Sequence, residues 1–265
     1  MQPILFRLPV LDVPIYSYGL MMVIGFLAAI QLAKFLARRS GIDPEIFVNA
    51  GLIALIAGVV GARLSHVIEN IHQYTDPSRS AWANFVDAIN IRSGGLTYYG
   101  GFLLAFPILV LYAIKKKVPL RLGMDIVAPC LMIGLGFGRI GCFLNGCCYG
   151  DVCDLPWAVT FPNNDLGPVH PAQLYSAFTA FVIAGISYSF FTLRPAPGRV
   201  FALMLMLEGT TRFILELLRV EPAVIGPFSL SMLLGIGIAL LGMALWFVFR
   251  PGIKSADAQP AATVA

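Results

Sequence analysis

Apolar residues occur along this chain in long runs that are separated by short polar segments. Seven of these runs approach the roughly 20 residues that a helix needs to cross the hydrocarbon core of a bilayer. The runs are Tyr16–Phe35, Ile46–Val67, Leu96–Ile114, Met124–Leu144, Leu174–Phe191, Val200–Leu218 and Ser229–Phe249. The pattern therefore predicts an all-α integral membrane protein with seven transmembrane helices.

The basic residues between the runs predict how the helices are oriented. One set of loops carries eleven of them, namely Lys34, Arg38, Arg39, Lys115, Lys116, Lys117, Arg121, Arg194, Arg199, Arg250 and Lys254. The opposite side carries four, namely Arg7, Arg79, Arg92 and Arg219. Because cytoplasmic loops are enriched in Lys and Arg, we expect the N-terminus outside and the C-terminus in the cytoplasm. An odd number of helices is then required, and seven meets that requirement.

Composition supports a membrane protein and argues against a nucleic-acid partner. Hydrophobic residues make up 58% of the 265 positions and charged residues only 12%, whereas soluble domains carry roughly 25% charged residues. The net charge of +4 is small and dispersed, so it reflects topology and not a surface for nucleic acid. The partner that composition indicates is the lipid bilayer.

Three segments lie outside the predicted bundle. Residues 69–93 alternate aromatic and aliphatic residues with polar ones, which is typical of an arm lying in the membrane interface. Residues 145–171 are rich in Gly, Pro and Asn and predict a small irregular cap on the outer side. Residues 255–265 predict a disordered cytoplasmic tail. The sequence shows no strong internal repeat and no second domain, so we expect residues 1–254 to form one transmembrane domain.

Arg139 is the most informative residue of the bundle. It lies near the outer end of the fourth run, and no carboxylate is present one helical turn away. An arginine in a membrane segment is costly and usually faces a polar cavity or an anion, although a side chain that reaches the headgroups is the alternative. Five glycines surround it, at positions 134, 136, 138, 141 and 146. We interpret this region as a cationic niche with close backbone access, suited to a phosphate.

The sixth run also carries charge. Glu208, Arg212, Glu216 and Arg219 follow one another at spacings of four, four and three, which places them on one helix face. Two interpretations stay open. The residues could form a self-neutralising ladder that lets a charged helix insert, or Arg212 could face the same cavity as Arg139 while the glutamates orient it.

Two further polar groups lie at outer helix ends. Arg63 is accompanied by His66 and Glu69, and an ion pair with Glu69 is one explanation for it. The segment 93–101 places paired glycines, among them Gly94 and Gly95, around two tyrosines that include Tyr99. Such a segment could present amide N–H groups to an anion, or it could be a flexible turn with interfacial tyrosines.

Four of the five cysteines cluster near the outer end of the fourth run, at positions 142, 147, 148 and 153. Structural disulfides or free thiols, redox catalysis, and a metal site that includes His170 are all open at this point. No Cys-x-x-Cys is present, and the spacing matches no standard zinc pattern. We therefore expect no metal and no cofactor.

The segment Gly138-Arg-Ile-Gly-Cys-Phe-Leu-Asn-Gly146 resembles the sequence signature of bacterial prolipoprotein diacylglyceryl transferases. Further blocks resemble the family in the same order along the chain. They are Tyr18-Gly-Leu-Met, Gly61-Ala-Arg63, Gly94-Gly-Leu-Thr-Tyr-Tyr-Gly-Gly101, His170-Pro-Ala-Gln-Leu-Tyr175 and Arg212-Phe-Ile-Leu-Glu-Leu-Leu-Arg219. Seven spans with an external N-terminus also match the family topology.

The resemblance implies an activity and its partners. Members of this family transfer the diacylglyceryl group of phosphatidylglycerol to the lipobox cysteine of a preprolipoprotein signal peptide, which forms a thioether and releases glycerol phosphate. This transfer is the first step of bacterial lipoprotein maturation. The implied location is the inner membrane, as a multi-pass protein with its active site towards the outer leaflet.

The resemblance also implies roles for individual residues. Arg139 would hold the phosphate, Arg212 would meet the charge that develops on the leaving group, and Tyr99 would donate a hydrogen bond. The implied substrate-binding residues also include Gly138, Gly141, Asn145, Tyr18, Arg63, Gly94, Gly95, Glu216 and Arg219.

The chain departs from the common family pattern at Tyr99, Cys142, Cys147 and Glu208, where His, Asn, Glu and Tyr are frequent. Two alternatives therefore remain, a divergent relative with another lipid donor or acceptor and a membrane thiol oxidoreductase.

Overall fold

The structure is a computed structural model that describes residues 4–8, 13–75, 79–90, 94–95, 97–162, 166–219 and 223–249. The chain forms two compact units, one from residues 1–36 together with 121–265 and the other from residues 37–120. The predicted tail, 255–265, lies outside the described residues, as do parts of the predicted arm and cap.

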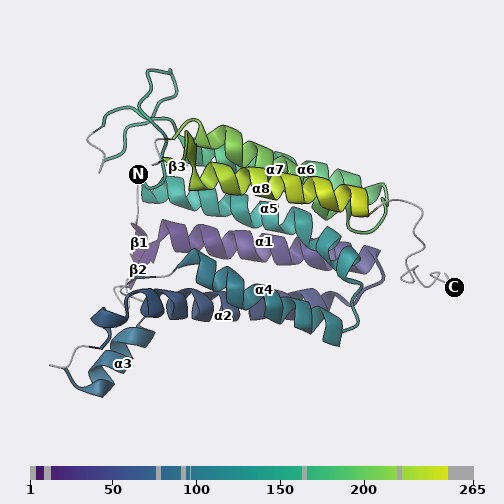
Figure 1. The fold of residues 1–265 in the computed structure, drawn as a ribbon, viewed down its shortest axis with the longest axis horizontal. Coiled ribbons are helices and arrows are strands. Elements are labelled where there is room, and N and C mark those ends of the chain that lie inside the picture. Colours follow the sequence, from purple (N-terminus) through teal and green to yellow (C-terminus); the bar gives the residue numbers. More distant parts are fainter. Residues whose placement is uncertain are drawn as a thin grey trace. The chain divides into compact units, whose positions relative to one another are not determined.

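Each of the seven apolar runs overlaps one long helix (Figure 1). The helices are α1 (Ser17–Arg39), α2 (Pro44–Glu69), α4 (Tyr98–Lys115), α5 (Leu120–Asn145), α6 (Ala172–Thr192), α7 (Arg199–Glu216) and α8 (Leu230–Val248). Five of them, α1, α2, α5, α6 and α8, are long and apolar enough to cross a membrane. The protein is thus an all-helical membrane protein.

Short elements complete the described chain. The arm segment contains a 3-10 turn at Ile71–Gln73 and the helix α3 (Ala81–Ile89). Two antiparallel hairpins were not predicted, one formed by β1 (Ile4–Leu8) and β2 (Val13–Tyr16) and the other by β3 (Ala223–Ile225) and β4 (Phe228–Ser229). The described part of the cap is irregular apart from the bridges of Val169 with Val152 and Val159.

In the first unit, α5, α6 and α7 share a buried apolar core. Its members are Ala128 and Met132 from α5, Ile183 and Ala184 from α6, and Val200 and Met204 from α7. Helix α1 packs closely against α5 at Gly25, which has no side chain. A Cβ at this position would lie only 2.8 Å from the Cβ of Phe137. The core therefore fixes α5 and α7, the two helices that carry Arg139 and Arg212.

Glycines let α7 and α8 approach closely over much of their length (Figure 1). A Cβ at Gly209 of α7 would lie only 2.5 Å from the backbone nitrogen of Ala239 and the carbonyl oxygen of Gly235 on α8. Small residues at such contacts give the close van der Waals packing that drives helix association in membranes. This contact holds the charged helix α7 against α8, the more apolar of the two.

A buried carboxylate fixes the start of α7. Asp125 of α5 is 2% exposed and accepts hydrogen bonds from the backbone N–H groups of Gly198, at 2.6 Å, and Phe201, at 2.9 Å. The first N–H groups of a helix have no partner inside the helix. Asp125 therefore caps α7 from a neighbouring helix, and its negative charge is favourable at the positive end of the helix dipole.

In the second unit, α2 and α4 make the main contact, again through glycine. A Cβ at Gly61 of α2 would lie 2.5 Å from the carbonyl oxygen of Gly100 on α4, and one at Gly101 would lie 2.8 Å from the carbonyl oxygen of Gly58. The two backbones therefore touch directly in the C-terminal half of α2, where Arg63 is located.

Candidate active site

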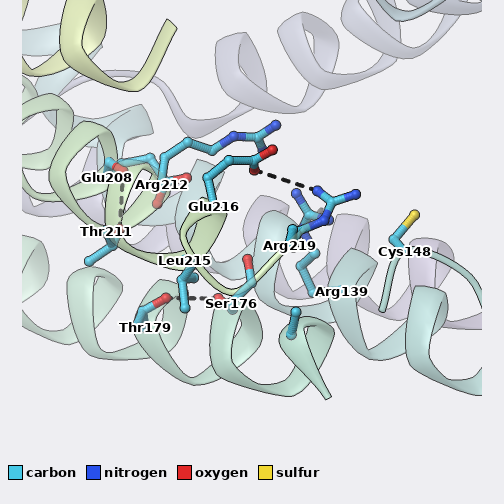
Figure 2. Close-up of a pocket in the computed structure, with 11 residues that line it drawn as sticks. Arg139, Cys148, Ser176, Thr179, Glu208, Thr211, Arg212, Leu215, Glu216 and Arg219 are labelled. Atoms are coloured by element: carbon cyan, nitrogen blue, oxygen red, sulfur yellow. Dashed lines mark hydrogen bonds and ion pairs between the residues drawn. The ribbon is translucent and has the colours of Figure 1, made fainter. Parts of the chain in front are cut away.

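A pocket in the first unit brings together the charged residues of α5 and α7. Its lining consists of Arg139, Cys148, Ala172, Ser176, Thr179, Glu208, Thr211, Arg212, Leu215, Glu216 and Arg219 (Figure 2). The space between these side chains amounts to about 390 Å³, counted out to the open solvent. Because this volume includes open solvent, the pocket is an open one, and its charged lining is what it offers to a ligand.

Helix periodicity explains why α7 lines this pocket. Positions 208, 211, 212, 215, 216 and 219 recur at intervals of three and four, and all of them face the cavity. The prediction that the charges of this segment share one face is thus confirmed. Arg139 joins them from α5 because the core described above holds the two helices in contact with α6.

The arginines of the pocket differ in their partners. Arg139 makes no hydrogen bond or ion pair with any residue that the structure describes, whereas Arg219 pairs with Glu216 at 3.6 Å. Arg212 donates a hydrogen bond of 3.4 Å to the hydroxyl of Ser231 on α8. Among the described residues Arg212 forms no ion pair, so the self-neutralising ladder of Glu208, Arg212 and Glu216 is not present.

Glu216 is the most enclosed acid of the pocket. It is 3% exposed and accepts a hydrogen bond of 3.4 Å from Ser229, while its other oxygen pairs with Arg219. The carboxylate is therefore fixed between α8 and the turn that follows α7. With Arg139, Arg212 and Arg219 set against Glu208 and Glu216, the cavity keeps an excess of positive charge when all five groups are ionised.

The C-terminal turn of α5 folds three cysteines together. Gly146 has a φ of 76°, a left-handed conformation that favours glycine. The next N–H, that of Cys147, donates to the carbonyl of Cys142 at 3.1 Å. Cys148, also left-handed with a φ of 65°, follows at the edge of the pocket. All five cysteines of the chain are described, and none of them forms a disulfide.

The two thiols beyond the end of α5 differ in acidity. A hydrogen bond with the Cys142 thiol lowers the pKa of Cys148, and the positive charges of Arg139 and Arg219 act in the same direction. Burial raises the pKa of the Cys147 thiol. Cys148 is therefore the one of the two that more readily forms a thiolate.

Other predicted site residues lie on the same helix as Arg139 or beside it. Gly138, Gly141 and Asn145 all belong to α5, and Asn145 is its last residue. A Cβ at Gly141 would lie 3.1 Å from the ring of Tyr18 on α1, so this glycine makes room for the tyrosine. Their roles in binding a substrate remain predictions.

The remaining predicted residues belong to the second unit. Arg63 is 6% exposed, and its guanidinium donates to the carbonyl oxygens of Ala88, Gly94, Gly95 and Asp87 at 2.7–3.0 Å. Glu69 instead accepts from Ser65 and Thr97, so the considered ion pair between Arg63 and Glu69 does not form. Both Gly94 and Gly95 have positive φ. Tyr99, in the first turn of α4, is 52% exposed.

Several residues that line or support the pocket could not be identified from the sequence. Ser176 and Thr179 of α6 and Thr211 of α7 line the cavity, but a hydroxyl in an apolar helix commonly bonds to its own backbone, as Thr179 does to the carbonyl of Ser176. Gln173 is fully buried and donates to the carbonyl of Cys147 at 2.6 Å. Its place in the block His170–Tyr175 was the only signal for it.

The fold and the pocket define a multi-pass membrane protein with an arginine-lined cavity. The family model described as prolipoprotein diacylglyceryl transferase matches residues 3–248. The phosphatidylglycerol–prolipoprotein diacylglyceryl transferase of Clostridium tetani is 31% identical over 94% of this chain and 97% of its own length. The proteins of the same name from Geobacter sulfurreducens and Vibrio parahaemolyticus are 33% and 32% identical over 92% and 93% of this chain, covering 94% and 91% of their own lengths. The chain therefore belongs to the prolipoprotein diacylglyceryl transferase family, and it is a multi-pass bacterial membrane protein.

Proposed function

We propose that this protein transfers the diacylglyceryl group of phosphatidylglycerol to the lipobox cysteine of preprolipoprotein signal peptides. The thiol sulfur forms a thioether with the glyceryl carbon, and glycerol phosphate leaves. The observation that carries the proposal is Arg139, which lines the pocket with Arg212 and has no counter-ion among the described residues of a chain that belongs to this family.

The chemistry of the leaving group explains why arginines suit the reaction. When the bond between the glyceryl carbon and the phosphate oxygen breaks, negative charge builds up on the departing phosphate monoester. Preorganised cations in a cavity with little water stabilise such charge more than water does. In this proposal Arg139 holds the phosphodiester, and Arg212, fixed by Ser231, meets the developing charge.

Other residues of the predicted site receive positioning or binding roles. Gly138 keeps α5 thin next to Arg139 and is assigned to headgroup binding, whereas Gly141 acts by making room for Tyr18. Asn145 orients glycerol hydroxyls, and Glu216 with Arg219 sets the charge around Arg212. We propose that Tyr18 of the first unit also contacts the substrate. In the second unit, we propose that Tyr99 donates a hydrogen bond and that Gly94 and Gly95 bind substrate through a backbone segment that Arg63 holds by its hydrogen bonds.

We further propose seven transmembrane helices in one catalytic domain, residues 1–254, with the N-terminus outside and the pocket towards the outer leaflet of the inner membrane. Within the first unit, Arg121 and Arg199 lie at one end, over the rings of Phe249 and Trp246 at 4.8 and 4.5 Å. The pocket is at the other end of the same helices, at the C-termini of α5 and α7. Basic and aromatic residues at the first end suit a cytoplasmic boundary.

The direct test is incubation of the purified protein with phosphatidylglycerol and a lipobox peptide, followed by mass spectrometry of the peptide. We expect a diacylglyceryl mass increment on the cysteine and none on a matched peptide whose lipobox cysteine is replaced by serine. A peptide that stays unmodified by active, folded protein would refute the proposal. If the peptide gains mass only when another phospholipid replaces phosphatidylglycerol, the protein is a relative that uses a different lipid donor.

A membrane thiol oxidoreductase is the second candidate, and the clustered thiols of Cys142, Cys147 and Cys148 are the observation that favours it. Such an enzyme would join two peptide cysteines in a disulfide at the expense of a quinone. Quinone-dependent loss of two hydrogens from a dithiol peptide, without lipid transfer, would establish it instead.

A further inference from the structure

Three thiols at and just beyond the C-terminal end of α5, of which Cys148 lines the arginine pocket, are arranged like the ligands of a metal ion. The sulfur atoms of Cys142, Cys147 and Cys148 all lie within 4.8 Å of one another, and those of Cys147 and Cys148 are 3.5 Å apart. Ligands on a tetrahedral Zn²⁺ with Zn–S bonds of about 2.3 Å are separated by about 3.8 Å. The backbone therefore already places three ligands at nearly the required spacing.

The surrounding residues hold this geometry in place. Left-handed Gly146 turns the chain back over the end of α5, and the Cys147 N–H bonds to the Cys142 carbonyl. Buried Gln173 donates to the Cys147 carbonyl from α6. Hydrogen bonds that fix the ligand-bearing backbone are typical of metal sites, where such supports orient the ligands.

We propose that Cys142, Cys147 and Cys148 bind Zn²⁺ and that the fourth coordination position takes the acceptor thiol of the lipobox peptide. Three protein ligands with one open position are typical of a catalytic zinc and not of a structural one. This inference rests on the proposed function, since it supplies the step that makes the acceptor nucleophilic.

The position of the cluster suits that step. Cys148 lines the cavity together with Arg139 and Arg219 (Figure 2). Zn²⁺ with three thiolates carries one net negative charge, and a fourth thiolate makes it two. The guanidinium groups at the same cavity offset this charge, so an anionic zinc centre and an anionic headgroup can share the pocket.

The chemistry balances without any redox partner. The acceptor thiol binds as a thiolate and its proton passes to water, because a coordinating thiol is deprotonated by the metal. The sulfur then attacks the glyceryl carbon, a C–S bond forms, and the C–O bond breaks with its electron pair going to the phosphate oxygen. The product thioether is neutral and a weaker ligand than a thiolate, so it leaves the zinc.

Binding of Co²⁺ to the full-length protein in detergent, under reducing and anaerobic conditions, tests the site itself. We expect one equivalent to give thiolate-to-cobalt charge-transfer absorption. Replacement of Cys142, Cys147 or Cys148 by serine should weaken the binding by at least about tenfold. Cys153→Ser and Cys130→Ser are the matched controls and should leave the spectrum unchanged. Equal cobalt spectra for all five variants, at unchanged melting temperature, would overturn the proposal.

Addition of the lipobox peptide tests the fourth position. The d–d bands of bound Co²⁺ should shift with the cysteine peptide and stay unchanged with its serine counterpart. Removal of metal should abolish lipid transfer, and Zn²⁺ should restore it. Full transfer by metal-free protein, or a disulfide among the three cysteines of the freshly purified active enzyme, would refute this inference and leave the proposed function standing. Stoichiometric metal with no lipid transfer would refute the proposed function, and the acceptor role with it.

Discussion

Arginines with similar sequence surroundings have different roles in this protein. Both Arg63 and Arg139 lie in apolar segments, and the sequence suggested polar surroundings for each. The guanidinium of Arg63 donates hydrogen bonds to four backbone carbonyl oxygens, whereas Arg139 has no such partner among the described residues. The sequence could predict that an arginine in the bundle faces polar groups. It could not predict which carbonyl oxygens reach Arg63, because these come from a distant segment that contains the left-handed residues Gly94 and Gly95.

Replacement of Arg212 by glutamine should slow lipid transfer strongly. Loss of one preorganised group that meets transition-state charge lowers the rate by about 100- to 1,000-fold. Ser231→Ala removes the hydroxyl that accepts from Arg212 but keeps the guanidinium, and it serves as the control, with a much smaller effect. Single-turnover rates of peptide modification measure both, and equal losses in the two variants would contradict a direct role for Arg212.

Arg63→Gln should lower the melting temperature of the purified protein. The four hydrogen bonds are partly buried. A fully buried carbonyl left without a donor costs about 1–3 kcal/mol, so we expect a loss of up to that size. The control is Arg79→Gln in the same part of the chain, which breaks an exposed ion pair with Asp87 that is worth at most about 1 kcal/mol. If both variants melt at the same temperature as the wild type, the guanidinium does not hold this segment together.

At the level of helices, hydrophobic pattern located the elements but could not pair them. Each of the seven apolar runs overlaps one long helix of the described chain. The runs can be recognised because a helix needs roughly 20 apolar residues to cross a bilayer. The pairing of α7 with α8, and of α2 with α4, depends on glycines of one helix lying against the backbone of the other. The periodicity of the sequence does not show which helix each glycine contacts. The same limit applies to the cysteines, which are brought together by left-handed residues at Gly146 and Cys148.

Gly209→Ala should destabilise the pair formed by α7 and α8. The new Cβ would lie 2.5 Å from backbone atoms of α8, which cannot move aside as a flexible side chain would, and overpacking of this kind costs about 1–3 kcal/mol. The matched control is Gly237→Ala, where nothing lies within 4 Å of the added Cβ. Thermal unfolding should show a lower midpoint for the first variant only, and a lower midpoint for both would contradict the packing argument.

Asp125→Ala should destabilise the start of α7. Two N–H groups would lose their acceptor in a buried setting, and losing a helix cap costs about 0.5–2 kcal/mol. Amide hydrogen exchange at Gly198 and Phe201 is the specific readout. Unchanged exchange there would show that the carboxylate does not cap the helix.

For the whole molecule, charge distribution carries information that hydropathy lacks. Helix α7 bears Glu208, Arg212 and Glu216 and is not among the five helices that length and composition select, yet the seven-span proposal requires it to cross the membrane. In that proposal its charges are tolerated because they line a cavity, as charged residues in membrane segments usually do. The prediction of seven spans therefore rests on charge balance as much as on apolar length.

Reporter fusions test that topology. A fusion after residue 249 should give active fluorescent protein and inactive alkaline phosphatase, since the C-terminus is expected in the cytoplasm. A fusion within residues 153–162 of the cap should give the reverse pattern. The same reporter active at both positions would contradict the odd number of spans, α6, α7 and α8, that the proposal places between the cap and the end of α8.

The role of Arg139 in turnover of the phospholipid is the central claim, and one measurement tests it most directly. Wild-type protein and Arg139→Gln, at equal melting temperature, are given phosphatidylglycerol and a lipobox peptide, and both lipidated peptide and glycerol phosphate are followed in a single turnover. We expect the wild type to release one glycerol phosphate per lipidated peptide, and the variant to be at least about 100-fold slower. Equal rates in the two proteins would contradict the account.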